Sequence, residues 1–453
     1  MASRVREAVA PAYLFLCLVA GGSAQGLWAN MLLQLLGVAI IAWAAMSGGS
    51  QPAPPARGLF LIVIAALVLI AIQLVPLPAS VWPHLGGREG IASGYKVLGI
   101  ATPPLPISLA PYDSLQALLT LVPPVAMLCA MLRLHAYRPS WLALALLGGT
   151  FCGILLGVLQ VASGDPLTSS WYLYPDVSFG LATGFFANAN HMATLLVVSL
   201  PFVAALVAAA RGANRQRQNA VAVMAASAVL VLVVGIALSR SLAGYGLAIP
   251  LLAGSALIVM PARSPLKRWV GIVGALSLIA AIGALESSSI RPNGFGAEAT
   301  SSVESREDML ATTWAATRDF LPLGSGVGTF RRVYDLYEDH DRITGTYVIH
   351  AHNDYAELLL EAGIPGLVIL ILFLVWWGRA SWSAWSSPHA GPFARAASIA
   401  SAAILAHSLV DFPLRTAAIS TAFAMCLSFL ADRRAVTASA PSDLRPTRHI
   451  VLG

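Results

Sequence analysis

Charged residues are scarce in this chain of 453 residues. They make up 11% of the sequence, whereas 57% of the residues are hydrophobic. A soluble domain carries about 25% charged residues. The composition therefore excludes an ordinary soluble domain and predicts a protein that crosses a membrane several times. The N-terminus resembles a secretory signal peptide, but further apolar runs follow at once, so we interpret the first run as a retained signal anchor.

Cysteine is also rare, and no metal-binding pattern accompanies it. The four cysteines, all in apolar runs, are Cys17, Cys129, Cys152 and Cys426. We expect buried or lipid-facing thiols there and no disulfides. No CxxC or HExxH spacing occurs, so the sequence predicts no metal site and no cofactor. The net charge of +6 comes from basic residues scattered among connections, which argues against a nucleic-acid-binding stripe.

Apolar runs of bilayer length are what the sequence has in abundance. A helix needs about 20 apolar residues to cross a membrane. The sequence therefore predicts an all-α polytopic membrane protein with about twelve transmembrane helices, nine of them within 1–285 and three within 352–432. The runs lie near residues 8–24, 26–46, 58–75, 114–132, 140–162, 188–210, 219–238, 241–260, 268–285, 363–378, 396–411 and 414–431.

Basic residues favour alternate connections between these runs, which indicates the orientation. With the N-terminus in the cytoplasm, the basic residues gather on the cytoplasmic side and most carboxylates fall on the other, as the positive-inside rule requires. The cytoplasmic set is Arg57, Arg133, Arg138, Arg211, Arg215, Arg217, Arg263, Lys267, Arg268, Arg379, Arg395, Arg433 and Arg434. The polar tail, 433–453, is predicted to be disordered and cytoplasmic.

Two outer loops are long. The first, 76–113, is rich in proline and suits irregular structure packed on the membrane surface. The second, 286–351, is the larger periplasmic piece. It begins with a flexible run and continues with two amphipathic helical stretches, VESREDMLATTWAATRDF and FRRVYDLYEDH. We therefore predict one larger, partly helical periplasmic loop.

An ionisable cluster, HAHNDYAELLLEAGIPG at residues 350–366, opens one of the apolar runs. Ionisable groups at the mouth of a membrane helix are costly unless they have a purpose. Imidazole is the usual side chain for moving a proton near neutral pH, so His352 is the candidate proton acceptor and His350 its less favoured competitor. The alternative is that these groups lie outside the hydrocarbon as solvated residues of the first helical turns.

The residues after His352 fit a helix start. Asn353 and Asp354 can supply a capping oxygen and a negative charge. Asp354, Glu357 and Glu361 share one helical face by their spacing. This face could orient a histidine or hold a sugar hydroxyl, or it could simply face the large loop.

Two further features of the sequence favour contacts between helices. Asn188, Asn190 and His191 form a polar patch where the sixth run begins, and amides at such a depth usually hydrogen-bond between helices. A direct contact with substrate is the alternative for this patch. Gly363 and Gly366 let another helix approach closely, which is ordinary membrane packing.

Arginines are the candidate phosphate ligands, because the planar guanidinium matches phosphate oxygens. Arg240, in LSRSLAGYG, lies in a tight outer connection against the positive-inside bias; its alternative is a residue that reaches up to lipid headgroups. Arg306 and Arg318 lie on the helical stretch of the large loop and could point to the membrane. Pairing with neighbouring carboxylates at the surface is the alternative for both.

Taken together, these motifs resemble a known family. HNDYAELLLEAGIPG is similar to the histidine signature of the O-antigen ligase and polymerase superfamily of bacterial glycosyltransferases, with His352, Asn353, Gly363 and Gly366 at its spacings. GFFANAN, LSRSLAGYG and TWAATRDFLPLGSGVGTF resemble three other stretches of the family, in the same order. The resemblance spans about residues 180–380. Arg240 to Gly244 departs from the Arg-x-x-x-Leu of some ligases, and the paired motifs of some polymerases are absent.

The resemblance implies a metal-independent, inverting glycosyltransferase without cofactors. It would move a glycan from undecaprenyl diphosphate to an acceptor, lipid A–core or another glycan, at the periplasmic face of the bacterial inner membrane, among inner-membrane lipids and without nucleic acid. His352 would be the base, and Arg240 and Arg306 would hold the diphosphate. The residues expected to support them are Asn353, Asp354, Glu357, Arg318, Asn190 and His350.

Two other classes of function stay open at this point. A lipid-linked glycan flippase or secondary transporter would predict ionisable residues near the bilayer midplane and two repeated halves, and neither is evident. A purely structural membrane partner would leave the cluster around His352 without a role.

Overall fold

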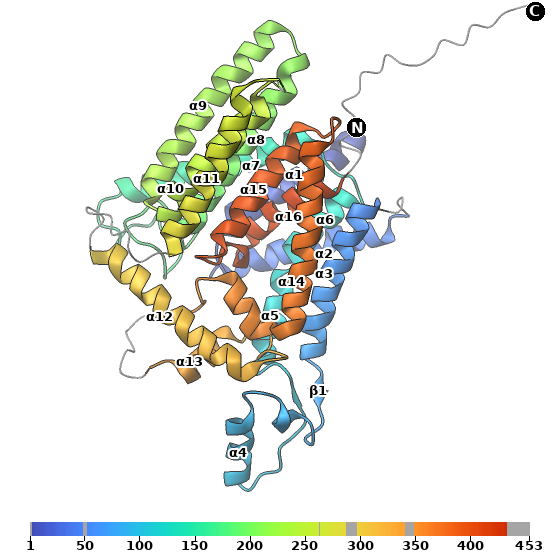
Figure 1. The fold of residues 1–453 in the computed structure, drawn as a ribbon, viewed down its shortest axis with the longest axis vertical. Coiled ribbons are helices and arrows are strands. Elements are labelled where there is room, and N and C mark those ends of the chain that lie inside the picture. Colours follow the sequence, from blue (N-terminus) through green and yellow to red (C-terminus); the bar gives the residue numbers. More distant parts are fainter. Residues whose placement is uncertain (1, 49–51, 262, 287–296, 340–347, 433–453) are drawn as a thin grey trace, which may run out of the picture.

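The computed structural model describes residues 2–48, 52–261, 263–286, 297–339 and 348–432. Helices dominate these residues (Figure 1). In chain order they are α1 (Ala2–Ala20), α2 (Leu27–Met46), α3 (Pro54–Gln73), α4 (Glu89–Val97), α5 (Pro111–Thr120), α6 (Val122–Leu132), α7 (Pro139–Ala162), α8 (Ala189–Ala209), α9 (Arg215–Ser239), α10 (Leu242–Val259), α11 (Leu266–Glu286), α12 (Ala297–Phe320), α13 (Phe330–Tyr337), α14 (Asp354–Ser386), α15 (Pro392–His407) and α16 (Ala417–Ala431).

Each predicted apolar run overlaps a helix, and the run at 114–132 is shared by α5 and α6. Within the described residues, eight helical stretches are long and apolar enough to cross a membrane: α2, α3, α5 with α6, α7, α8, α9, α10 and α14. The chain is therefore an all-α polytopic membrane protein. The number twelve stays a prediction, because the helices of four predicted runs, α1, α11, α15 and α16, are not among these eight.

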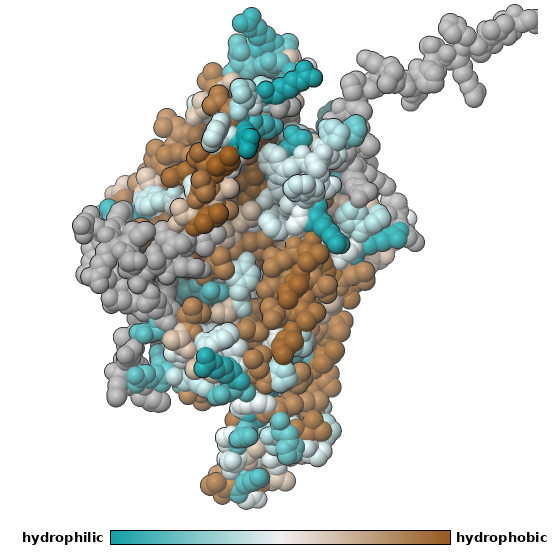
Figure 2. Space-filling view, viewed as in Figure 1, coloured by the Kyte–Doolittle hydropathy of each residue, from teal (hydrophilic) through white to brown (hydrophobic). Residues whose placement is uncertain are grey.

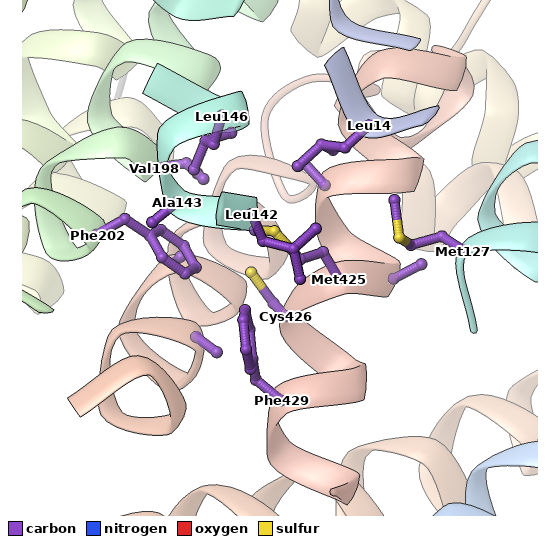
Figure 3. Close-up of a cluster of buried hydrophobic side chains, with 14 of the residues drawn as sticks. Leu14, Met127, Leu142, Ala143, Leu146, Val198, Phe202, Met425, Cys426 and Phe429 are labelled. Carbon is purple, nitrogen blue, oxygen red and sulfur yellow. The ribbon is translucent and has the colours of Figure 1, made fainter. Parts of the chain in front are cut away.

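The core forms where five helices from distant parts of the sequence meet (Figure 3). Leu142 of α7, Phe202 of α8 and Phe429 of α16 point toward one another and are at most 2% exposed. Leu14 of α1 and Met127 of α6 close the cluster. α8 is buried along most of its length because it packs against α7, α9, α10 and α15.

The outer surface of the helices is apolar where it would meet lipid. Figure 2 shows brown surface over α14 and α3 and over α10 and α11, with teal residues gathered toward the ends. Ile364, Val368 and Ile371 of α14 are each about half exposed, as is Ile64 of α3. Such a surface is unfavourable in water and suits hydrocarbon.

The connections between helices gather at two ends of the bundle. At one end, which we call the basic end, Arg6 donates to the carbonyl of Leu134, and the hydroxyl of Tyr137 donates to Asp432. At the other end, which we call the site end, the amide of Ala182 donates to Leu238 and that of Asp354 to Ser408. Segments that were predicted on the same side of the membrane therefore contact one another at the same end of the bundle.

The proline-rich loop at the site end is more ordered than the sequence suggests. A short antiparallel pair of strands, β1 (Pro76–Leu77) and β2 (Leu105–Pro106), frames it, and α4 lies at its tip (Figure 1). Arg88 is fully buried and donates to the carbonyls of Gly86, Ile107 and Gly324. Burial lowers the pKa of Arg88 to about 10. This arginine fastens the loop to the turn between α12 and α13.

α14 is kinked at Gly363, and the reason differs from the predicted one. Gly363 has a φ of 59°, and a Cβ there would lie 2.2 Å from the carbonyl oxygen of Pro322. The partner that needs this glycine is therefore the turn after α12, whereas a neighbouring helix was expected. Gly324 in that turn has a φ of 80°, and a Cβ there would lie 2.5 Å from the carbonyl oxygen of Glu361. Two interlocked glycines thus join the large loop to α14.

The two helices predicted in the large loop are confirmed as α12 and α13. The predicted disordered tail, 433–453, lies outside the described residues, as do 287–296 and 340–347 of the loop. The last two predicted runs, 396–411 and 414–431, differ from the structure. α15 ends at His407 and α16 begins at Ala417, so 408–416 form a polar connection with a short 3-10 turn, η4 (Pro413–Arg415).

Candidate active site

His352 lies directly ahead of α14 and faces a buried carboxylate that the sequence analysis missed. Its Nδ1 is 3.4 Å from Oδ1 of Asp411, which lies in the α15–α16 connection. The imidazole is 26% exposed and the carboxylate 1%. A buried carboxylate beside one ring nitrogen favours a proton on that side and leaves the other nitrogen free to act as a base.

Asp411 is shared by further histidines. Nε2 of His191, on the first turn of α8, is 3.8 Å from its Oδ1, and Nε2 of His407 is 3.9 Å from its Oδ2. Both rings are buried. Nδ1 of His407 also lies 2.6 Å from the hydroxyl of Thr194. A single carboxylate thus ties α8, α15 and the segment ahead of α14 into one polar cluster, in which His352 is the partly exposed imidazole.

The backbone at two predicted site residues is unusual. Among the described residues other than glycine, a left-handed backbone occurs at His135, Arg240 and His352, with φ near 50° at each. This conformation costs about 1–3 kcal/mol and persists where the surroundings enforce it. Two of the three positions are those selected from the sequence as base and phosphate ligand.

A second imidazole, that of His350, has its own carboxylate. Its Nδ1 is 2.9 Å from Oε1 of Glu357, which is 1% exposed. The rings of His350 and His352 both lie against Phe412, with centroids 4.4 and 4.9 Å from its centroid. Glu357, predicted as a possible orienting group, therefore orients His350 and not His352.

Arg415 neutralises the acidic face of α14. Its Nε is 3.4 Å from Oδ1 of Asp354, and its Nη2 is 3.2 Å from Oε1 of Glu357 and 3.6 Å from Oε2 of Glu361. All three predicted acidic residues therefore do share one face. The arginine that holds them was missed, because the sequence analysis placed position 415 inside an apolar span.

Glu361 also holds the large loop in place. Its Oε1 accepts hydrogen bonds from the amides of Gly328 and Phe330, at 2.9 and 3.0 Å. Its main-chain carbonyl accepts one from the Gln73 side chain at the end of α3. The alternative that this face meets the large loop is therefore correct for Glu361.

Asn353 and Asp354 begin α14 as predicted. The Asn353 side chain accepts hydrogen bonds from the amides of Tyr355 and Ala356 and donates to the carbonyl of Leu409. Asp354 Oδ2 accepts from the hydroxyl of Ser408. Both residues fasten the start of α14 to the connection that carries Asp411, so they hold His352 and its carboxylate in register.

Arg240 lies at the same end of the bundle, between α9 and α10. It is exposed, and among the described residues no carboxylate lies within ion-pairing distance of it. The neighbouring Ser241 caps α10 and donates to Oδ1 of Asn190 at 2.7 Å. Asn190 directly precedes His191 in α8, and His191 lies beside Asp411. The start of α8 therefore contacts both the α9–α10 connection, which carries Arg240, and Asp411. The predicted contact of Asn190 between helices is confirmed.

The second candidate phosphate ligand stays open. Arg306 lies in α12, but its side chain is outside the described residues. Arg318, three turns later, is exposed and lies over the ring of Trp314, 5.8 Å from its centroid. Surface contact is thus the observed state of Arg318, and which of the two arginines contributes to the site stays a prediction.

A cavity of about 340 Å³ adjoins the site end between α3, α14, α15 and α16. Asp354, Ser408 and Arg415 form its polar part, and the rest of its lining is mostly apolar, with residues such as Leu370 and Phe423. The size and the lining suit a hydrocarbon segment better than a sugar.

The sequence analysis did not select three residues of the candidate site, Asp411, Phe412 and Arg415. Their signal was the polar run DFPLRT between two apolar runs, in which a proline follows an acid and a basic residue follows the proline. Within the described residues, no group of three or more potential ligands has the geometry of a metal site.

Comparison with known proteins agrees with these motifs. Residues 177–371 match the O-antigen ligase family. The match begins ahead of Asn188 and ends within α14, so Asp411 and Arg415 lie beyond it. No curated protein matches the chain. The matched segment contains Arg240, the α12–α13 turn and His352, which the structure gathers at one end of the bundle. Residues 177–371 are therefore a domain of the O-antigen ligase family, the one that the sequence motifs resemble.

Proposed function

We propose that the protein transfers a glycan from undecaprenyl diphosphate to an acceptor hydroxyl at the periplasmic face of the inner membrane. The family supports a glycosyltransferase of the O-antigen ligase or polymerase type in a multi-pass bacterial inner-membrane protein. The observation that carries the proposal is the pairing of His352 with buried Asp411 at the same end as the exposed cation of Arg240.

The reaction needs one proton acceptor and one stabilised leaving group. His352 takes the proton of the acceptor hydroxyl, whose oxygen attacks the anomeric carbon of the donor. The bond from that carbon to the phosphate oxygen breaks, and undecaprenyl diphosphate leaves with the electron pair. A single displacement of this kind inverts the anomeric centre. Asp411 stabilises the protonated imidazole that results.

Arg240 would hold the diphosphate. A guanidinium presents planar, paired donors, so it can bind two phosphate oxygens and offset the charge that develops on the leaving group. The left-handed backbone and the hydrogen bond between Ser241 and Asn190 fix the position from which this side chain projects. Arg306 or Arg318 would supply the second cation.

The orientation rests on the separation of the two ends. The site end carries His352, Arg240 and the large loop, whereas the basic connections gather at the other end, which the positive-inside rule assigns to the cytoplasm. The active site would therefore face the periplasm, where both a lipid-linked donor and lipid A–core are accessible.

Transfer by the purified protein tests the proposal. The protein is reconstituted in vesicles with a labelled undecaprenyl-diphosphate-linked glycan, and lipid A–core or a second carrier-linked glycan is offered as acceptor. We expect labelled product with an inverted linkage from one acceptor, and none from His352→Ala, although that variant still binds the donor. Full transfer by His352→Ala would remove the proposed base, and movement of the donor across the bilayer without transfer would indicate a flippase.

A further inference from the structure

His350 lies closer to its carboxylate partner than His352 does, and the proposed reaction gives His350 no role. Its Nδ1 is 2.9 Å from Oε1 of Glu357, whereas His352 Nδ1 is 3.4 Å from Asp411. An ionised carboxylate only accepts hydrogen bonds, so Nδ1 of His350 is the donor. In the neutral ring, Nε2 then carries the lone pair and is left for another group.

The carboxylate that orients His350 is itself fixed. Oε2 of Glu357 accepts a hydrogen bond from the amide of Ala351 at 3.0 Å, and Arg415 Nη2 lies 3.2 Å from Oε1. The Glu357 side chain is 1% exposed, so it has no room to turn away. The His350 ring is therefore held in one orientation while 26% of its side chain remains accessible.

The two imidazoles lie close enough to act on one molecule. Each packs against Phe412, so their centroids cannot be farther apart than the sum of their distances to that ring, 4.4 and 4.9 Å. Each also remains 26% exposed. An acceptor sugar presents several hydroxyls on neighbouring carbons, whereas a simple alcohol presents one.

We propose that His350 is a second imidazole that contacts the acceptor and selects for a sugar with more than one free hydroxyl. Its Nε2 accepts a hydrogen bond from a hydroxyl close to the reacting one, while His352 takes the proton of the reacting hydroxyl. No bond forms or breaks at His350. Glu357 is a positioning residue that acts through His350. This inference rests on the proposed function and adds the recognition of its acceptor.

Two substitutions separate contact with the acceptor from a structural role. In His350→Asn the amide nitrogen takes the place of Nδ1, so the bond to Glu357 is retained and Nε2 is lost. In His350→Gln the amide lies near the place of Nε2. We expect the Asn variant to raise the KM for the acceptor about tenfold or more with little change in kcat, as for the loss of one hydrogen bond, and the Gln variant to lie closer to the unsubstituted protein.

The measurement uses the full chain in lipid nanodiscs. Binding of lipid A–core and of a carrier-linked glycan is followed by calorimetry, and transfer is followed separately. The matched control is His389→Asn, at an exposed position between α14 and α15 at the basic end, which should change neither quantity. His352→Asn should lower kcat instead of raising the KM.

The outcomes distinguish the two proposals. If the Asn variant at position 350 binds and transfers normally while the Gln variant fails, His350 only holds Glu357, and this inference is overturned alone. If an acceptor binds in a way that depends on Nε2 of His350 but no glycan is transferred, the proposed function fails and the contact stands. If neither acceptor binds the unsubstituted protein, both are overturned.

Discussion

Two connections at the same end of the bundle carry arginines, and they hold them in opposite ways. In the α9–α10 connection, Arg240 is exposed and no described carboxylate lies within ion-pairing distance. In the α15–α16 connection, Arg415 lies within 3.2–3.6 Å of three carboxylates on α14. The difference separates an exposed cation from one that neutralises the acids of the protein itself.

The substitution Arg415→Ala should have the largest effect, and the effect should be on folding. Removal of this cation leaves the buried carboxylates of Glu357 and Glu361 without the arginine that they share, and breaking a buried ion pair costs about 3–5 kcal/mol. Thermal unfolding in one detergent, with Arg240→Ala as the comparison, measures it. If the two variants were equally stable, the ion pairs of Arg415 would contribute no more to the fold than exposed Arg240 does.

The substitution Arg240→Ala should act on the donor and leave the fold intact. Loss of charge-assisted hydrogen bonds to phosphate costs about 1.5–3 kcal/mol, or roughly 10–150-fold in donor affinity. Arg240→Lys should recover part of this, because it keeps the charge and loses the paired donors. Equilibrium binding of labelled donor reports both. A lysine variant with unchanged affinity would contradict paired recognition of the phosphates.

The substitution Asp411→Asn should slow transfer with the donor affinity preserved. The shape of the side chain is kept but its charge is lost, so the protonated His352 ring is less stabilised, and we expect a fall of about 10–100-fold in kcat. Steady-state transfer at saturating donor and acceptor measures kcat, and equilibrium binding measures the donor affinity. An unchanged kcat would show that Asp411 is only structural.

The substitution Ser241→Ala should have the smallest effect. It removes the cap of α10 and the hydrogen bond to Asn190, at a cost of about 1 kcal/mol. Donor affinity should therefore fall less than tenfold, because Arg240 keeps its charge and loses only part of its support. The donor-binding assay used for Arg240 measures it. A loss as large as that of Arg240→Ala would indicate that Ser241 contacts the donor directly.

Local sequence was enough for the parts of the site that depend on neighbours in the chain. Asn353 caps α14 because an amide oxygen reaches the amides two and three residues ahead, and Asp354, Glu357 and Glu361 share a face because of helical spacing. The alternation of basic connections likewise agrees with the two ends of the bundle. These features require no knowledge of the fold.

Local sequence did not predict the contacts between distant segments. Glu357 was a candidate partner for a histidine, but spacing does not say that His350 receives it and that His352 faces Asp411, 59 positions later. The kink glycine Gly363 was assigned to helix packing, whereas the turn at Pro322 is what approaches it. Such pairings follow from how the helices pack.

The sequence by itself determined a helical membrane protein, its candidate base and its candidate phosphate ligand, because hydropathy, charge and motif spacing are properties of the chain. Only the tertiary structure decided which charges compensate one another. A carboxylate in an apolar bundle is stable where a cation or an imidazole meets it, and the residues that meet here, in α8, α14 and the α15–α16 connection, are brought together by packing alone.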